Sequence, residues 1–219
     1  MPPLSNYLAF VAATIVLIFI PGPSMLFIIG RSMALGRIGG LLSVLGNALG
    51  MVPYLTIVAL GLGALIGSSA VFFNLVKVVG AAYLVYLGIQ SIRHRKARAE
   101  ATLAEDRTRS RWRILVDGFA VGATNPKTIA FFVAVLPQFV DASRGNATLQ
   151  LAIFGLTFFV AALLGDSLTA LVAGTARDWF VRSPRRAEHL ATVGGVMLLV
   201  LAVALLFTGA LPHTAQAAL

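Results

Sequence analysis

Apolar residues are concentrated in six stretches of the chain, each about as long as a membrane-spanning helix. The stretches cover residues 4–30, 39–67, 71–92, 114–137, 147–175 and 189–210. About 20 apolar residues are needed to cross a hydrocarbon core of about 30 Å, because an α-helix rises about 1.5 Å per residue. The pattern therefore predicts an all-α membrane protein with six transmembrane helices. Residues 67–69 leave so short a connection that the second and third helices are expected to be antiparallel neighbours.

Short motifs that contain proline interrupt two of these stretches. The first contains Pro21-Gly22-Pro23, and the fourth contains Asn125-Pro126-Lys127. Proline lacks the backbone N–H and clashes with the preceding helical turn. In hydrocarbon such a break is tolerated only where protein or water covers the freed backbone groups, and transporters use similar breaks to contact substrates. The sequence predicts broken first and fourth helices, and it leaves open a plain kink or a helix end at the membrane surface.

The two halves of the chain follow the same order of elements. Each half has a broken span, an uninterrupted span and a span that begins near glycine, and residues 79–85 resemble residues 193–199. Because each half has an odd number of spans, the second copy must enter the membrane from the opposite side. We therefore predict two inverted three-helix repeats, residues 1–92 and 114–219, joined by the basic segment 93–113.

The charges support a membrane location and suggest an orientation. Only 11% of residues are charged and 58% are hydrophobic, with a mean hydropathy of +0.91, whereas a soluble domain has about 25% charged residues. All of the 17 Lys and Arg residues except Lys77, Lys127 and Arg144 fall in the three connections on one side. The positive-inside rule places this side in the cytoplasm and both termini in the periplasm. Segment 93–113 is interpreted as a topology anchor, and binding of nucleic acid is not expected.

Two charges lie deep inside apolar spans, Lys127 in the fourth and Asp166 in the fifth. Such residues are costly in a membrane and usually mark a substrate path or a proton relay. They could form an ion pair that serves coupling, or one that only holds two helices together. Asp117 lies closer to the cytoplasmic surface, where we expect water to solvate it.

Uncharged polar residues and glycines also occur inside the spans. Asn47, Tyr54 and Asn125 would either line a cavity or bond to a neighbouring helix. Small residues four apart allow close packing of membrane helices. The two candidate pairs are Gly46 with Gly50 and Gly118 with Gly122.

The residue types argue against an enzyme. The chain has no cysteine, and its three histidines lie outside the spans or at their edges, so neither a metal site nor another cofactor is expected. Gly165-Asp166 lacks the first glycine of the Gly-x-Gly-Asp stretch of intramembrane aspartyl proteases. An intramembrane serine protease would need a central histidine.

Several motifs resemble those of the LysE/RhtB (lysine exporter) family of amino-acid exporters, in the family's order from about residue 4 to 210. The matching segments are 21–26 (PGPSML), 30–37 (GRSMALGR), 46–50 (GNALG), 80–88 (GAAYLVYLG), 125–127 (NPK) and 136–139 (LPQF). The resemblance implies a six-span transporter of the bacterial inner membrane that exports amino acids or close derivatives. One position departs from the pattern: Met51 stands where many members have an acidic residue, which leaves Asp166 as the main buried carboxylate.

From these observations we expect a secondary transporter that exports an amino acid or derivative from the cytoplasm, as a proton-coupled antiporter. The expected substrate-binding residues are Pro21, Gly22, Pro23, Ser24, Asn47, Tyr54, Asn125, Pro126 and Lys127. Coupling is assigned to Asp166 together with Lys127. The expected partners are the small-molecule substrate and the lipid bilayer, and a homo-oligomer is left open. Two alternatives remain: an exporter of another amphipathic metabolite such as a lactone or drug, and an uncoupled channel or scaffold.

Overall fold

The computed structural model describes an all-helical chain. It describes residues 1–219 with the exception of 66–69, 98–99, 101–109, 176–182 and 208–219. Within the described residues there is no β-strand, and four helical segments are long and apolar enough to cross a membrane: Pro23–Leu60, Arg111–Phe139, Ala147–Thr175 and Glu188–Leu206. Two shorter apolar helical segments, Leu4–Phe19 and Val78–Arg93, accompany them. The predicted class, an all-α membrane protein, is confirmed.

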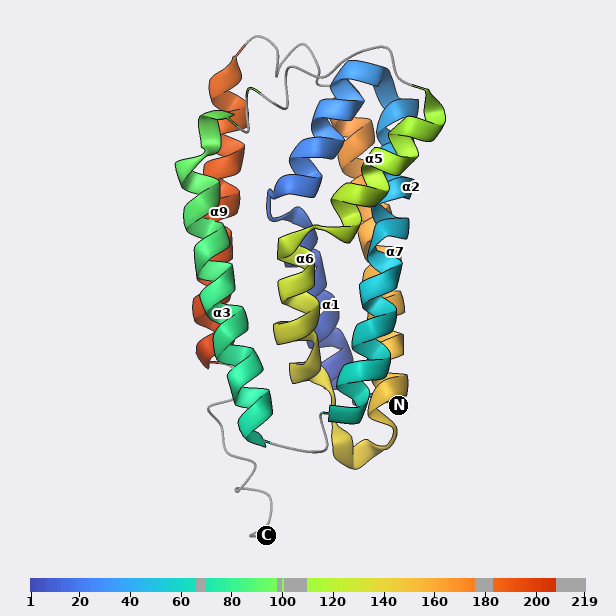
Figure 1. The fold of residues 1–219 in the computed structure, drawn as a ribbon, viewed down its shortest axis with the longest axis vertical. Helices are drawn as coiled ribbons and strands as arrows, with labels where there is room; N and C mark the ends of the chain where they lie inside the picture. The colour runs from blue at the N-terminus through green and yellow to red at the C-terminus, as the bar shows by residue number, and fades with distance from the viewer. Residues whose placement is uncertain (66–69, 98–99, 101–109, 176–182, 208–219) are drawn as a thin grey trace.

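The helices run back and forth along one long axis (Figure 1). Their bounds are α1 Leu4–Phe19, α2 Pro23–Leu65, α3 Ala70–Arg93, α5 Arg111–Ala123, α6 Pro126–Ala130, α7 Ala147–Thr175 and α9 Pro184–Phe207. A π-helical turn at Phe131–Val135 and 3₁₀ turns at Leu136–Phe139 and Ala142–Arg144 lie between α6 and α7. The predicted connection at 67–69 and most of the basic segment 93–113 lie outside the described residues.

α2 reverses its direction at one residue. Gly36 has φ 74° and ψ −175°, and it is the non-helical position inside α2. Glycine adopts positive φ readily because it has no Cβ. The first part of α2 continues the line of α1, and the second part runs back in the opposite direction (Figure 1). The chain therefore folds back here almost without a loop, where the sequence predicted a polar connection between two spans.

Both predicted breaks are present. α1 ends at Phe19 and α2 begins at Pro23, while α5 ends at Ala123 and α6 begins at Pro126. Each break falls at a proline that starts the next helix, a position at which the missing N–H costs no helical hydrogen bond. Each of these two chain segments is thus divided into two half-helices, each with an end at the break.

The helices pack in two groups around the second break. α2 packs along α5 and α7, α3 packs along α9, and α3 also contacts α6 and the π-helical turn. Phenylalanine rings fill the space between α1, the π-helical turn and α7, with centroid distances of 4.7 Å for Phe10–Phe154 and for Phe132–Phe158. Such aromatic pairs contribute about 0.5–1.5 kcal/mol beyond their buried area. The ring cluster closes off one side of the region where the two breaks meet.

Glycines bring α2 and α5 into backbone contact. A Cβ at Gly118 would lie 2.6 Å from the carbonyl oxygen of Ser43, and a Cβ at Gly122 would collide with that of Asn47. Likewise, a Cβ at Gly46 would collide with the Leu115 carbonyl. The close packing predicted for the two glycine pairs is confirmed, and the two pairs pack against each other. This contact fixes the position of Asn47, which is fully buried.

Candidate functional site

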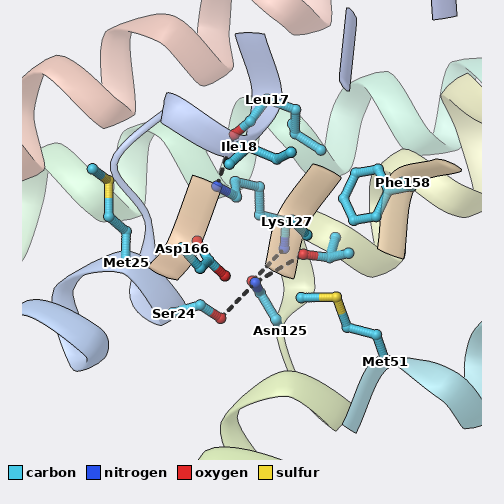
Figure 2. Close-up of a pocket in the computed structure, with 11 residues that line it drawn as sticks. Leu17, Ile18, Ser24, Met25, Met51, Asn125, Lys127, Phe158 and Asp166 are labelled. Carbon is cyan, nitrogen blue, oxygen red and sulfur yellow. Dashed lines mark hydrogen bonds between the residues drawn. The ribbon is translucent and has the colours of Figure 1, made fainter. Parts of the chain in front are cut away.

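The two breaks and the two buried charges meet at one cavity (Figure 2). Its lining residues are Leu17, Ile18, Ser24, Met25, Met51, Asn125, Lys127, Thr128, Phe158, Ala162 and Asp166. The cavity offers about 20 Å³ to the centre of a water molecule, which is room for about one ordered water. Small-molecule sites usually enclose about 300 Å³ or more. The cavity in this structure is therefore too small for an amino acid, and we refer to this narrow state as the closed conformation.

Lys127 joins the second break to the first. Its backbone N–H donates to Asn125 Oδ1, 3.2 Å away, at the start of α6. Its Nζ donates to the carbonyl oxygens of Leu17 at 3.0 Å and Ile20 at 2.8 Å. These oxygens lie at the C-terminal end of α1, where the helix dipole attracts a cation. In a continuous helix Leu17 would receive a hydrogen bond from residue 21, which is proline and has no N–H.

Asn125 holds the starts of two helices together. Its Nδ2 donates to Ser24 Oγ at 2.7 Å and to Thr128 Oγ1 at 2.8 Å (Figure 2). Ser24 belongs to the first turn of α2, and Thr128 belongs to α6. Each of these three residues is 5% exposed or less. One amide side chain therefore ties the segment that follows the first break to the segment that follows the second.

Asp166 lies on α7 and is 8% exposed. Its Oδ2 accepts a hydrogen bond from Asn47 Nδ2 of α2, at 3.2 Å. In the described part of the chain no ion pair within 4 Å joins Asp166 to Lys127, since Lys127 donates to the α1 carbonyls instead. The two groups line the same cavity and are close enough for their charges to interact. The structure thus has two separated opposite charges at one buried cavity.

The other predicted site residues lie around Lys127 and Asp166, and most of them do not line the cavity. Gly22 lies beside the Lys127 stem, because a Cβ there would be 3.3 Å from Lys127 Cδ. Pro21 and Pro23 flank that glycine, and Pro126 begins α6. Asn47 stands behind Asp166 as its donor.

Tyr54 lies outside the cavity lining. Its ring packs against Phe132 with centroids 5.7 Å apart, and its buried hydroxyl has no hydrogen-bond partner among the described residues. Tyr54 is not among the described residues that face the cavity.

Several lining groups were not predicted from the sequence. Thr128 directly follows Lys127, and a polar residue next to a buried charge was an available signal. The Leu17 carbonyl could have been found by counting four residues back from Pro21. Met25 and Phe158 have no such signal, because apolar residues of their kind are common in every span.

A second polar cluster lies nearer the basic end of the molecule. Arg31 Nη2 is 2.8 Å from Asp117 Oδ2, Arg113 Nε is 3.1 Å from Asp117 Oδ1, and the Arg31 guanidinium lies 5.1 Å from the Phe27 ring centroid. From the sequence we placed Arg31 in a polar connection, which was wrong: α2 continues past Arg31, whose side chain is 3% exposed. Asp117 pairs with Arg31 and Arg113 and is 18% exposed, so its solvation by water stays a prediction.

The cluster stands between the cavity and the basic end. Arg31 follows Ser24 by two helical turns, or about 10 Å, on the same face of α2. It ties α2 to α5 at that level, because Asp117 belongs to α5.

Comparisons with known proteins agree with a transporter. The sequence model of the LysE type translocator family matches residues 15–209. An uncharacterized membrane protein of Vibrio cholerae is 31% identical over 193 residues, which cover 88% of this chain and 92% of that protein. The homoserine/homoserine lactone efflux protein of Salmonella typhi is 30% identical over 194 residues, which cover 89% of this chain and 92% of that protein. No solved structure matches.

Proposed function

The chain belongs to the LysE type translocator family, and on this premise we propose that it exports an amino acid or an amino-acid derivative from the cytoplasm in exchange for protons. The Salmonella relative is named for the efflux of homoserine and its lactone, which supports a small amino compound as substrate. These two compounds share a primary ammonium group, whereas only homoserine has a free carboxylate. As in other translocators, the chemistry is movement of a solute and not catalysis.

We propose that the helices form six membrane passes in two inverted repeats, residues 1–92 and 114–219. α1 and the first part of α2 would form one pass, and the part of α2 after Gly36 would form the next. α5, α6 and the turns that follow would form another broken pass. The basic segment 93–113 would face the cytoplasm and both termini the periplasm, in a bacterial inner membrane.

The observation that carries the proposal is the convergence of both breaks, Lys127 and Asp166 at one buried cavity. Residues 21–24 and 125–127 would contact the substrate, with Lys127 and the start of α2 holding its carboxylate. Asn47 and Tyr54 would support this site from behind. Asp166 would carry the coupled proton, since a carboxylate can exchange one at this depth. The closed cavity must widen during alternating access before a substrate fits.

The test is gradient-driven transport by the purified full-length protein in liposomes. A panel of amino acids, with homoserine and homoserine lactone included, is offered with and without an imposed proton gradient. We expect at least one member to accumulate against its own gradient, and only when the proton gradient is present. Flux of panel members that only runs downhill, whatever the proton gradient, would identify a channel and contradict the proposal.

A further inference from the structure

The end of α1 presents two carbonyl oxygens to one donor. Leu17 O and Ile20 O lie 3.0 and 2.8 Å from Lys127 Nζ. Pro21 cannot supply the helical donor that Leu17 O would otherwise receive. Ile20 has extended backbone angles, φ −67° and ψ 115°, which end the helical hydrogen-bond series. Leu17 O keeps one backbone donor, the Ile20 N–H at 3.1 Å, whereas Ile20 O has no backbone donor among the described hydrogen bonds. Both carbonyls lie at the negative end of a helix, where a cationic donor is favoured.

The group that fills this position is a primary ammonium without an ion-pair partner within 4 Å among the described residues. Lys127 is 5% exposed, so its charge is offset by the two carbonyls, by the α1 dipole and at longer range by Asp166. An ammonium has three N–H donors. Two of them are used on the α1 carbonyls, which leaves one for the cavity.

For Lys127 to leave this position, its stem needs room to move. It passes over Gly22, where the missing side chain leaves room beside Cδ and Cε. A lysine stem has several rotatable single bonds. A rotation about them would swing Nζ away from the α1 carbonyls, toward the side of the cavity that Asp166 lines.

We infer that the broken end of α1 is a binding site for a primary ammonium group, which Lys127 fills in the closed conformation and the ammonium of the substrate fills during transport. The second part of this inference, that the substrate ammonium binds there, rests on the proposed function. Amino acids and amino lactones carry the same group as the lysine tip, so one can replace the other on the same two oxygens. The displaced Lys127 then faces the substrate carboxylate or Asp166. At each stage one cation occupies the α1 end, and no carbonyl is left unpaired in hydrocarbon.

The first experiment uses Lys127→Ala in the full-length protein and n-propylammonium as the probe. This probe restores the three carbons and the ammonium that the substitution removes. We expect a saturable rise of the melting temperature, about 5 °C or more far above the dissociation constant, in the variant and not in the wild type. Tetramethylammonium has no N–H and should have no effect. Lys96→Ala, which alters an exposed lysine, is the matched control.

No shift with propylammonium, or an equal shift with tetramethylammonium or in Lys96→Ala, would overturn the ammonium site. If Lys127→Ala is recovered unfolded, adding propylammonium during expression and purification should restore its yield. Failure to restore the yield counts against the site in the same way.

The second experiment uses the wild type and tests the substrate half. The transported compound is compared in liposomes with its N-acetyl derivative, which keeps the carboxylate or lactone and lacks the ammonium. We expect kcat/KM to fall by at least tenfold, and equal transport would overturn the substrate half while leaving the exporter intact. If no panel member is transported, the proposed function fails, and the propylammonium shift still decides whether the ammonium site exists.

Discussion

Asp166 and Lys127 are hydrogen-bonded to different neighbours, and this separation shapes what their substitutions should do. Asp166 accepts from Asn47, whereas Lys127 donates to the end of α1. In a pair that only held two helices together, each charge would be the main partner of the other. Removing both charges would then relieve the cost of leaving either one alone. In this structure, removing the Asp166 carboxylate would leave Asn47 without its acceptor. Removing the Lys127 ammonium would leave the two α1 carbonyls without that donor.

Replacing Asp166 by Asn should abolish proton-driven export and retain exchange of substrate for substrate. The amide keeps a similar shape and can still bond to Asn47, but it cannot carry a proton through the cycle. Uphill accumulation and counterflow measured in the same liposomes separate the two activities. Glu100→Gln, at an exposed carboxylate, serves as control and should behave as wild type.

The double variant Asp166→Asn/Lys127→Ala completes this test. We expect it to remain without driven export, because the proton carrier and the α1 partner are both lost. Recovery of gradient-driven export in the double variant would show that the two charges have only a structural role.

At the level of the helices, we expect transport to slow when the break between α1 and α2 is removed. In Pro21→Ala with Pro23→Ala, residue 21 regains an N–H and can bond to Leu17 O as in a continuous helix. That bond competes with Lys127 for the carbonyl. We expect a protein that inserts at normal level and transports at least tenfold more slowly. Pro53→Ala, at an exposed proline inside α2, should transport normally. Wild-type rates in the double variant would make the break dispensable.

The contact between α2 and α5 should tolerate no added methyl group. Gly122→Ala places a Cβ against the Asn47 carbonyl, and overpacking of this kind costs about 1–3 kcal/mol. The control is Gly155→Ala, whose new Cβ would find its nearest neighbour, Leu55 Cδ2, at 3.6 Å. Thermal unfolding in detergent should show a lower melting temperature for Gly122→Ala and no drop for Gly155→Ala. Equal stability of the two variants would contradict the close contact.

For the whole molecule, the distribution of basic residues predicts one orientation. Single cysteines can be introduced at exposed positions of this cysteine-free chain, at Ser5 and Ser143 for one end and Lys96 for the other. In intact cells an impermeant thiol reagent should label positions 5 and 143, and position 96 only after the cells are opened. The reverse pattern would invert the topology.

The parts of the fold that follow from local chemistry could be predicted from the sequence. Apolar length indicates the membrane helices, and Pro21 and Pro126 mark both breaks, because a missing N–H acts within one turn. The helical fold-back at Gly36 could not be predicted, since many residues of this kind remain helical. Arg31 was misplaced for a related reason: its partner Asp117 is 86 positions away.

The candidate site could likewise be predicted from the sequence only in part. A buried charge is visible in the sequence, so Lys127 and Asp166 were found. What each of them contacts depends on helix packing, and the sequence could not show that Lys127 reaches the end of α1 or that Asn47 serves Asp166. Backbone acceptors such as Leu17 O carry no side-chain signal at all.

The hydrogen bonds from Lys127 to the end of α1 also bear on how the protein is made. Leu17 and Lys127 are 110 positions apart. At about 5–20 residues per second, a ribosome needs roughly 5 to 20 s to add the lysine after the leucine. For that time the Ile20 carbonyl lacks its lysine donor and has no backbone donor among the described hydrogen bonds, and an unmet group costs several kcal/mol in hydrocarbon. The end of α1 must therefore keep contact with water or with the insertion machinery until the second half arrives to complete it.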